Sequence, residues 1–248
     1  MNGTLLVTGG SRGIGAAIAR MAAGRGFDVA VNYRSARSAA EAVAADVQDA
    51  GQQACIVQGD VSREDDVRRV FETVDRELGR LTALVNNAGV VGPVCRVEDL
   101  THATLRQVFD LNVIGSFLCA REAIRRMSTR HGGSGGAIVN LSSIAARLGN
   151  PNVWIHYAAS KGAIDSFTIG LAKEIGPDGI RVNAVAPGVI DTEIHEPLGG
   201  RERYPAVAAE TPLRRVGTPD EVAEAVLWLL SDAASFVTGT IVEAAGGR

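Results

Sequence analysis

The feature that most constrains the fold is a regular alternation of short apolar runs with helical segments. Seven apolar runs predict buried strands at residues 4–10, 27–34, 54–60, 83–89, 136–143, 180–188 and 239–247. Helices are expected between them at 13–26, 39–51, 62–79, 101–130, 156–175 and 218–231. Strands that alternate with helices predict an α/β fold: a doubly wound, Rossmann-like, seven-stranded parallel sheet with helices on both faces.

One domain is expected over residues 1–248, because no repeat, long linker or low-complexity segment interrupts the alternation. Ser62 is the expected N-cap of the helix at 62–79, which Gly79 would end. Residues 189–217 are rich in proline and glycine and show no clear periodicity. Long irregular segments in compact domains often serve function, so this segment is predicted to be a mobile substrate lid.

The composition excludes several functional classes. The formal net charge is −3 without long basic runs, so neither nucleic acid nor a membrane surface is an expected partner. No secretion signal is recognised at the N-terminus, and no apolar run reaches the roughly 18 residues of a membrane span. The three cysteines show no paired spacing, and the four histidines are scattered. We therefore expect no metal site and a cytoplasmic location.

A glycine-rich loop, "TGGSRGIG" at residues 8–15, follows the first predicted strand and opens the first predicted helix. Glycines let the backbone approach a pyrophosphate at the helix N-terminus, where free N–H groups point outward. An ordinary strand-to-helix turn is the alternative, but the position after the first strand of a doubly wound sheet favours nucleotide binding. The predicted cofactor contacts here are Gly9, Ser11, Arg12, Gly13, Ile14 and Gly15.

The end of the second predicted strand indicates NADP (NADPH) rather than NAD. Enzymes that select NAD usually place an acid there for the ribose hydroxyl, whereas this chain has Asn32, Tyr33 and Arg34. Arg34, together with Arg12, can bind a 2′-phosphate through paired, charge-assisted hydrogen bonds. The alternative is that both arginines are ordinary surface residues. Asn32, Tyr33 and Arg34 are the predicted cofactor contacts at this strand end.

The segment "YAASK", residues 157–161, places a tyrosine four residues before a lysine, on one face of a helix. Only Lys161 and Lys173 are lysines among 25 basic residues. An ammonium about 4 Å from a phenol, at an effective dielectric near 20, contributes about 4 kcal/mol, enough to lower a tyrosine pKa from about 10 to about 7. An ordinary half-buried helix tyrosine is the alternative interpretation of Tyr157.

Taken together, the motifs resemble those of the short-chain dehydrogenase/reductase family along essentially the whole chain, in particular the branch of glucose dehydrogenases and 3-oxoacyl-carrier-protein reductases. The resemblance rests on several segments in order: "TGGSRGIG", "GDV" (59–61), "NNAG" (86–89), "LNVIG" (111–115), "NLSS" (140–143), "YAASK" and "VNAVAPG" (182–188). A Tyr-x-x-x-Lys pair alone would be common by chance, but the ordered set is specific.

The resemblance implies a catalytic set of Asn112, Ser143, Tyr157 and Lys161. Tyr157 would exchange a proton with the substrate, Lys161 would hold the nicotinamide ribose and lower the tyrosine pKa, and Asn112 would keep a water in the proton relay. Ser143 would hold the substrate oxygen, although its spacing from Tyr157 is one residue longer than usual, so Ser142 stays open. Implied cofactor contacts are Tyr157 and Lys161 again, with Asp60, Val61, Asn87, Ala88, Gly89, Pro187, Gly188, Val189 and Thr192.

The resulting prediction is an NADP-dependent oxidoreductase that transfers a hydride between the nicotinamide and a small-molecule carbonyl or secondary alcohol. A non-catalytic NADP-binding sensor or scaffold is the alternative, and a sugar-nucleotide epimerase of the extended branch fits the glycine spacing less well. The resemblance implies a homotetramer. The expected substrate pocket comprises Val91–Val94, Arg147, Leu148, Val153–His156 and a lid from His195 to Tyr204.

Overall fold

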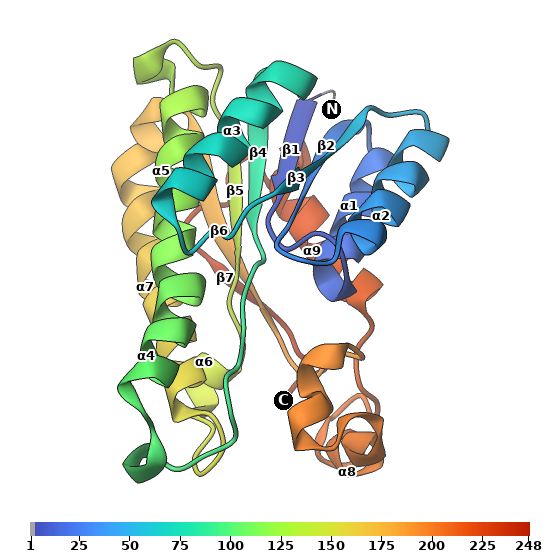
Figure 1. Cartoon of the computed structure of the whole chain (residues 1–248), viewed down its shortest axis with the longest axis vertical. Helices are drawn as coiled ribbons and strands as arrows, with labels where there is room; N and C mark the ends of the chain where they lie inside the picture. The colour runs from blue at the N-terminus through green and yellow to red at the C-terminus, as the bar shows by residue number, and fades with distance from the viewer. Residues whose placement is uncertain (1–2) are drawn as a thin grey trace.

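A computed structural model of the protein describes residues 3–248. For His195 and Pro197 it describes the backbone only. One parallel sheet runs through it in the order β3-β2-β1-β4-β5-β6-β7 (Figure 1). The strands are β1 (Gly3–Val7), β2 (Phe27–Tyr33), β3 (Ala54–Gln58), β4 (Leu81–Asn86), β5 (Gly136–Leu141), β6 (Ile180–Pro187) and β7 (Ile241–Ala244). The predicted doubly wound, seven-stranded fold is confirmed.

Helices cover both faces of the sheet. On one face lie α1 (Gly13–Ala23), α2 (Arg37–Asp49) and α9 (Pro219–Leu230), and on the other lie α3 (Glu64–Leu78), α5 (Gly115–Met127) and α7 (Ile155–Ile175). Leu5 and Val7 of β1 point into the first core, whereas Leu6 between them points into the second. Two buried faces explain why the strands are apolar throughout rather than alternating.

The region expected as one long helix, 101–130, is divided. The structure has α4 (His102–Phe109), a single π-helical turn (Asp110–Ile114) and then α5. Insertions of this kind occur often at functional sites, because the wider turn redirects one side chain. Here the turn contains Asn112.

The predicted N-cap at Ser62 is wrong. Helix α3 begins at Glu64 with Arg63 in the N-cap position. The hydroxyl of Ser62 instead donates to the carboxylate of Asp60 at 2.7 Å. The local acid attracts this hydroxyl away from the helix end, an effect that a capping pattern does not reveal.

Buried polar side chains join the central strands to α7. The side-chain amide of Asn86 on β4 donates to the side-chain oxygen of Asn140 on β5 at 2.9 Å. The amide of Asn140 donates to the hydroxyl of Thr168 on α7, also at 2.9 Å. All three residues are buried. Since buried polar groups are costly without partners, these bonds fix the position of α7 along the sheet.

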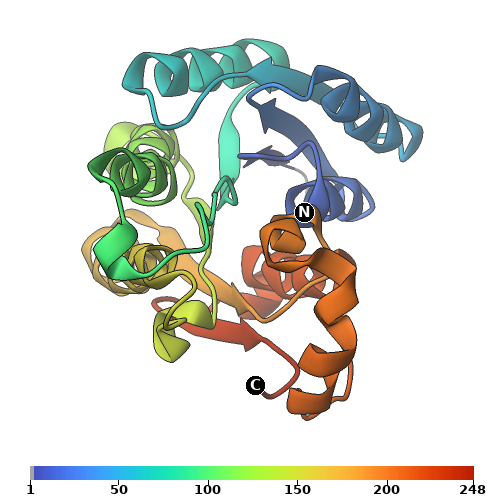
Figure 2. The same ribbon diagram turned by 60° about the horizontal axis from the view of Figure 1, so that its bottom comes forward.

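The loops after the strands meet at one edge of the sheet (Figure 2). Strand order reverses between β1 and β4, which is where ligands bind in open α/β sheets. The segment 189–217 borders this edge and has more regular structure than expected: two 3-10 segments (Glu193–Leu198 and Gly200–Arg203), followed by α8 (Tyr204–Glu210). The short helix α6 (Ala145–Leu148) lies at the same edge.

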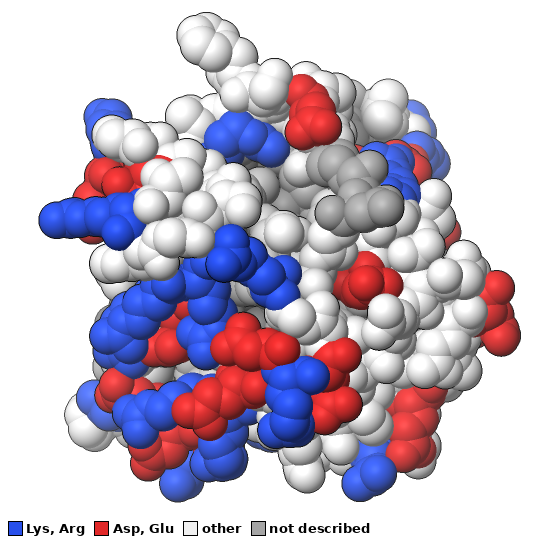
Figure 3. All heavy atoms as spheres, turned by 90° about the horizontal axis from the view of Figure 1, so that it is seen from above, with Lys and Arg blue, Asp and Glu red and all other residues white. Residues whose placement is uncertain are grey.

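At the opposite edge, basic and acidic side chains are interleaved, so the visible face carries no large patch of one sign (Figure 3). Such mixing gives this face no electrostatic basis for binding a polyanion. Among the described residues, no helix combines the length and apolar character needed to cross a membrane.

Candidate active site

The glycine loop between β1 and α1 has the backbone shape of a phosphate cradle. Gly9 and Gly13 have φ values of +61° and +52°, which side chains disfavour. A Cβ on Gly15 would overlap the carbonyl oxygen of Gly9 and the side-chain amide of Asn87, and a Cβ on Gly13 would lie 3.3 Å from Thr192. These positions therefore require glycine, and the tight turn into the start of α1 fits a dinucleotide pyrophosphate.

Asn32, a predicted cofactor contact, supports this loop through its side chain. Asn32 is buried; its oxygen accepts from the Gly9 N–H at 3.2 Å, and its amide donates to the carbonyl of Gly59 at 3.1 Å. Tyr33 lies in the core of that face. Arg34 is the first residue beyond β2 and is 64% exposed, with a guanidinium nitrogen 4.0 Å from the carboxylate of Asp60.

Asn112 is locked into place from the π-helical turn. Its oxygen accepts from the Val90 N–H, and its amide donates to the Val90 carbonyl, both at 2.9 Å. The amide also donates to the Ser160 hydroxyl at 3.0 Å. A Cβ added to Gly89 would lie 3.3 Å from the Asn112 oxygen and 3.7 Å from the Lys161 ammonium, so these three predicted residues are neighbours.

The two candidate serines have different partners. The Ser142 hydroxyl donates to the carboxylate of Asp165 on α7. The Ser143 hydroxyl is close enough to the phenol of Tyr157 to lower its pKa, and it accepts from the Ala145 N–H at 3.1 Å. Adjacent residues at a strand end point in opposite directions, which explains the division. Ser143 is therefore the serine that faces the tyrosine.

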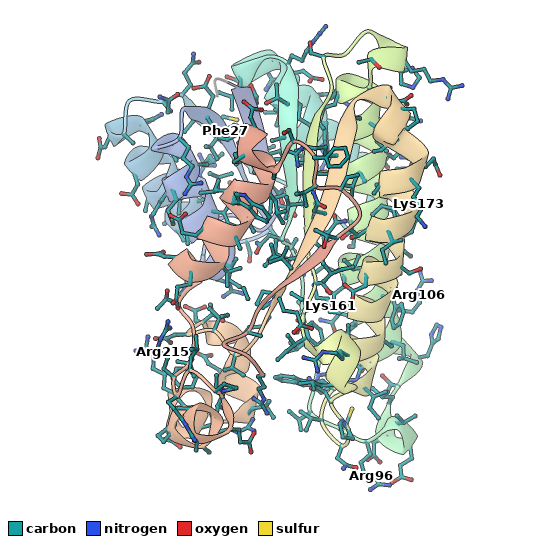
Figure 4. All side chains as sticks on the ribbon, turned by 180° about the vertical axis from the view of Figure 1, so that it is seen from behind. Phe27, Arg96, Arg106, Lys161, Lys173 and Arg215 are labelled. Atoms are coloured by element: carbon teal, nitrogen blue, oxygen red, sulfur yellow. The ribbon has the colours of Figure 1, made fainter. Side chains whose placement is uncertain are left out.

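Lys161 lies on the inner side of α7, toward the sheet, whereas Lys173 lies on the outer side (Figure 4). Lys161 is only 5% exposed, and its ammonium donates to the carbonyl of Leu141 at the end of β5 at 2.6 Å. It lies 5.6 Å from the centre of the Tyr157 ring. Burial lowers the pKa of Lys161 to about 8, with the charge of Asp165 opposing the shift.

The expected lowering of the tyrosine pKa is wrong for this structure. Burial raises the pKa of Tyr157 to about 12, and the hydrogen bond from Ser143 offsets only part of that rise. The charge of a nearby ammonium is not the dominant effect here, because desolvation disfavours the phenolate. The ammonium of Lys161 is also directed at Leu141 rather than at the phenol.

A cavity of about 350 Å³ joins the glycine loop to the predicted catalytic side chains. Most of its remaining wall is apolar, including Leu148, Trp154, Ile194 and Val207. The predicted catalytic and cofactor residues that line it, with the alternative serine, are Ile14, Asn87, Gly89, Ser142, Ser143, Tyr157, Lys161, Pro187, Gly188, Val189 and Thr192. From the predicted substrate pocket and lid, the lining residues are Val91, Leu148, Val153, Trp154, Leu198, Gly200, Arg203 and Tyr204.

Some pocket predictions need correction. Arg147 is ion-paired with Glu243 at 3.0 Å rather than lining the cavity. His156 is buried, with its Nε2 2.9 Å from the Val91 carbonyl, so it supports the loop after β4. The side chain of His195 lies outside the described residues. Arg248 lines the cavity but was missed, because only the folded chain brings it next to the other lining residues. Val207 also lines it, within the predicted lid but beyond the predicted pocket residues.

A family model described as "Enoyl-(Acyl carrier protein) reductase" matches residues 9–248. The chain is 50% identical over 243 residues to "Uncharacterized oxidoreductase YgfF" of Escherichia coli, covering 98% of each. It is also 36% identical to "Glucose 1-dehydrogenase 2" of Bacillus subtilis over 244 residues (98% and 93% covered) and 37% identical to a "3-oxoacyl-[acyl-carrier-protein] reductase" of Synechocystis over 247 residues (98% and 95%).

A solved short-chain type dehydrogenase/reductase from Mycobacterium marinum superposes with a TM-score of 0.92 at 35% identity, covering 99% of this chain and 94% of that one. The chain belongs to the short-chain dehydrogenase/reductase family, which confirms the resemblance. It is an oxidoreductase of the kind that acts on alcohol and carbonyl groups with a nicotinamide cofactor.

The buried lysine makes a prediction about stability and pH. Because the folded protein holds Lys161 at a pKa of about 8, below its ordinary 10.5, the unfolded chain binds more protons between these values. The free energy of unfolding of the cofactor-free protein should therefore rise by up to about 3 kcal/mol from pH 8 to 10.5, relative to Lys161→Met. Denaturant unfolding of both proteins measures this difference, and parallel pH profiles would contradict it.

Proposed function

We propose that this protein is an NADP-dependent dehydrogenase or reductase in which Tyr157 exchanges the proton with the substrate oxygen. The observation that supports this most is the convergence of Tyr157, Ser143 and Lys161 on one cavity, with Asn112 directly behind them and the glycine loop beside them. A bound nicotinamide would supply or accept the hydride.

In the reducing direction, the neutral phenol of Tyr157 donates its proton to the carbonyl oxygen while the hydroxyl of Ser143 orients that oxygen. A pKa of about 12 keeps the phenol protonated at neutral pH, as a donor requires. Lys161, with a pKa of about 8, is mostly charged at pH 7, and its ammonium would donate to the ribose of the nicotinamide. Asn112 keeps the adjacent loop in place through its paired bonds to Val90.

Substitution of Tyr157 tests the proton donor. Tyr157→Phe should lower turnover at least about 100-fold, because general acid–base catalysis typically contributes 10² to 10⁴, and NADPH affinity should stay within about two-fold. Ser143→Ala should lower turnover more than the matched variant Ser142→Ala, because in the unmodified protein the Ser142 hydroxyl is bonded to Asp165. NADPH oxidation against a panel of ketones, with NADPH binding by fluorescence, provides the measurement.

Two results would contradict this proposal. An unchanged rate in Tyr157→Phe would exclude the phenol as proton donor. NADPH binding without oxidation by any carbonyl compound in the unmodified protein would favour the non-catalytic sensor instead.

Cofactor preference rests on Arg34. No acid follows β2 immediately, and the exposed Arg34 can contact a 2′-phosphate, while Arg12 is paired with Glu193 at 2.9 Å. Arg34→Asp should shift the NADPH-to-NADH ratio of kcat/KM by roughly 10 to 150-fold, the effect of losing a charge-assisted bond. Arg37→Asp, a nearby exposed arginine paired with Glu41, is the control and should shift it far less. Equal use of both cofactors by the unmodified protein would refute the preference.

The assembly proposal is a homotetramer. Phe117 on α5 is 48% exposed and stacks on Phe167 of α7, with ring centroids 3.8 Å apart, and Ile114 and Ile169 of the same helical region are exposed as well. A second apolar surface, near the C-terminal strand, includes the fully exposed Phe236 and the partly exposed Trp228. Two separate apolar surfaces on one chain fit two kinds of symmetric contact.

Loss of one surface should therefore leave dimers. Phe117→Glu is expected to convert tetramers to dimers in sedimentation, because a buried unpaired carboxylate disfavours that contact. Val97→Glu, at an exposed apolar residue of a separate 3-10 turn, should remain tetrameric. A 25.9 kDa species alone at micromolar concentration of the unmodified protein would contradict the proposal.

Residues 189–217 are proposed to act as a lid, since their short helices border the cavity. A reducing compartment, the cytoplasm, is proposed because Cys55, Cys95 and Cys119 are all free.

A further inference from the structure

The charged side chains that line the cavity are all basic. They are Lys161, Arg203 and Arg248, and no aspartate or glutamate is among the described residues of the wall. The rest of the wall is largely apolar, so an anion entering the cavity meets positive charge and no acidic side chain in the wall. Lys161 lies deep, beside the tyrosine, whereas the exposed Arg203 lies in the lid segment.

Four other arginines in or near the cavity wall and the 189–217 segment have a carboxylate partner. The ion pairs are Arg12–Glu193 at 2.9 Å, Arg147–Glu243 at 3.0 Å, Arg201–Asp191 at 2.9 Å and Arg248–Glu210 at 2.8 Å. Arg203 has no carboxylate within 4.0 Å among residues 3–248. A planar guanidinium with free donors is the preferred partner of a carboxylate, which it binds through two parallel hydrogen bonds.

The backbone brings this arginine to the cavity. Gly199 and Gly200 have φ values of +90° and +52°, and they turn the chain immediately before the segment that ends at Arg203. A Cβ on Gly199 would lie 3.5 Å from Cγ of Arg203, so the stem of the arginine lies along this glycine. Tyr204, the next residue, also lines the cavity, and its hydroxyl donates to Asp191 at 3.1 Å. Arg203 is left without such a partner.

We propose that Arg203 binds a carboxylate of the substrate, so that the protein acts on oxo acids or the corresponding hydroxy acids. The reacting carbon lies at Tyr157 and Ser143, an apolar chain lies against the wall, and the carboxylate reaches the guanidinium at the mouth. The wall supports an apolar chain between two polar groups, because most of its other residues are apolar, Trp154, Ile194 and Val207 among them. This proposal rests on the oxidoreductase function proposed above.

A series of oxo acids of increasing length tests the proposal. The substrates are 4-oxopentanoate, 5-oxohexanoate and 6-oxoheptanoate, each paired with its methyl ester, and NADPH oxidation is followed. One acid should exceed its ester in kcat/KM by at least about 10-fold. Arg203→Gln should lower kcat/KM for that acid by roughly 10 to 150-fold, mainly through KM, and change the ester by less than about two-fold.

Arg201→Gln is the matched control, because Arg201 lies in the same 3-10 segment but is paired with Asp191. It should leave the ratio of acid to ester within about two-fold of the unmodified protein. Arg203→Lys should lower kcat/KM for the acid less than Arg203→Gln does, since lysine keeps the positive charge but lacks the planar guanidinium. A second readout is calorimetric binding of hexanoate and hexanamide to the NADPH-bound protein, where Arg203→Gln should weaken only hexanoate.

Three outcomes would overturn the proposal. In the first, the acid and its ester have equal kcat/KM. In the second, Arg203→Gln lowers kcat/KM for the acid and the ester equally. In the third, Arg203→Gln weakens the binding of NADPH itself, which would assign the arginine to a cofactor phosphate. The first two leave the oxidoreductase function intact if the esters are reduced. If no carbonyl compound is reduced, the oxidoreductase function fails. Preferential binding of hexanoate over hexanamide that depends on Arg203 would then still support the carboxylate site. If that preference is also absent, both the oxidoreductase function and the carboxylate site are overturned.

Discussion

The architecture around the cavity depends on the burial of one ammonium group. A charged lysine that is 5% exposed destabilises the folded state unless it finds partners, and the lowered pKa of Lys161 reflects that cost. Its direct hydrogen-bond partner is the carbonyl of Leu141, the last residue of β5. This bond exists only if α7 has one particular position along the sheet. The buried chain from Asn86 through Asn140 to Thr168 holds α7 there.

The buried ammonium of Lys161 also determines which partners the neighbouring polar residues have. Asp165, one helical turn after Lys161, lies close enough to favour its charge, and burial raises the pKa of this carboxyl. The hydroxyl of Ser142 satisfies the carboxylate and so is held away from the tyrosine. Ser143 is then the serine left to contact Tyr157. The choice between two adjacent serines thus follows from the need to satisfy a partly buried acid.

Local chemistry made much of this structure predictable. Strand runs and the glycine loop depend on residues next to one another, so their positions were correct to within a few residues. The π-helical turn, the supporting role of Asn32 and the mouth position of Arg248 depend on segments that meet only after folding. The tyrosine pKa was predicted in the wrong direction because a pairwise charge estimate does not include desolvation, which requires knowledge of burial.

The ion pair between Arg12 and Glu193 links the glycine loop to the segment 189–217. Both side chains are mostly exposed, so the pair contributes at most about 1 kcal/mol and is weakened by salt. Burial of an apolar side chain contributes about 1.5–3 kcal/mol, and Val207 of α8 is already buried while Ile194 remains partly exposed. Apolar packing on the cavity wall therefore contributes more free energy than this surface ion pair to holding residues 189–217 against the cavity. An apolar substrate body would add to that packing, and the same segment carries Arg203 to the mouth, so covering the substrate and recognising its charge would both depend on residues 189–217.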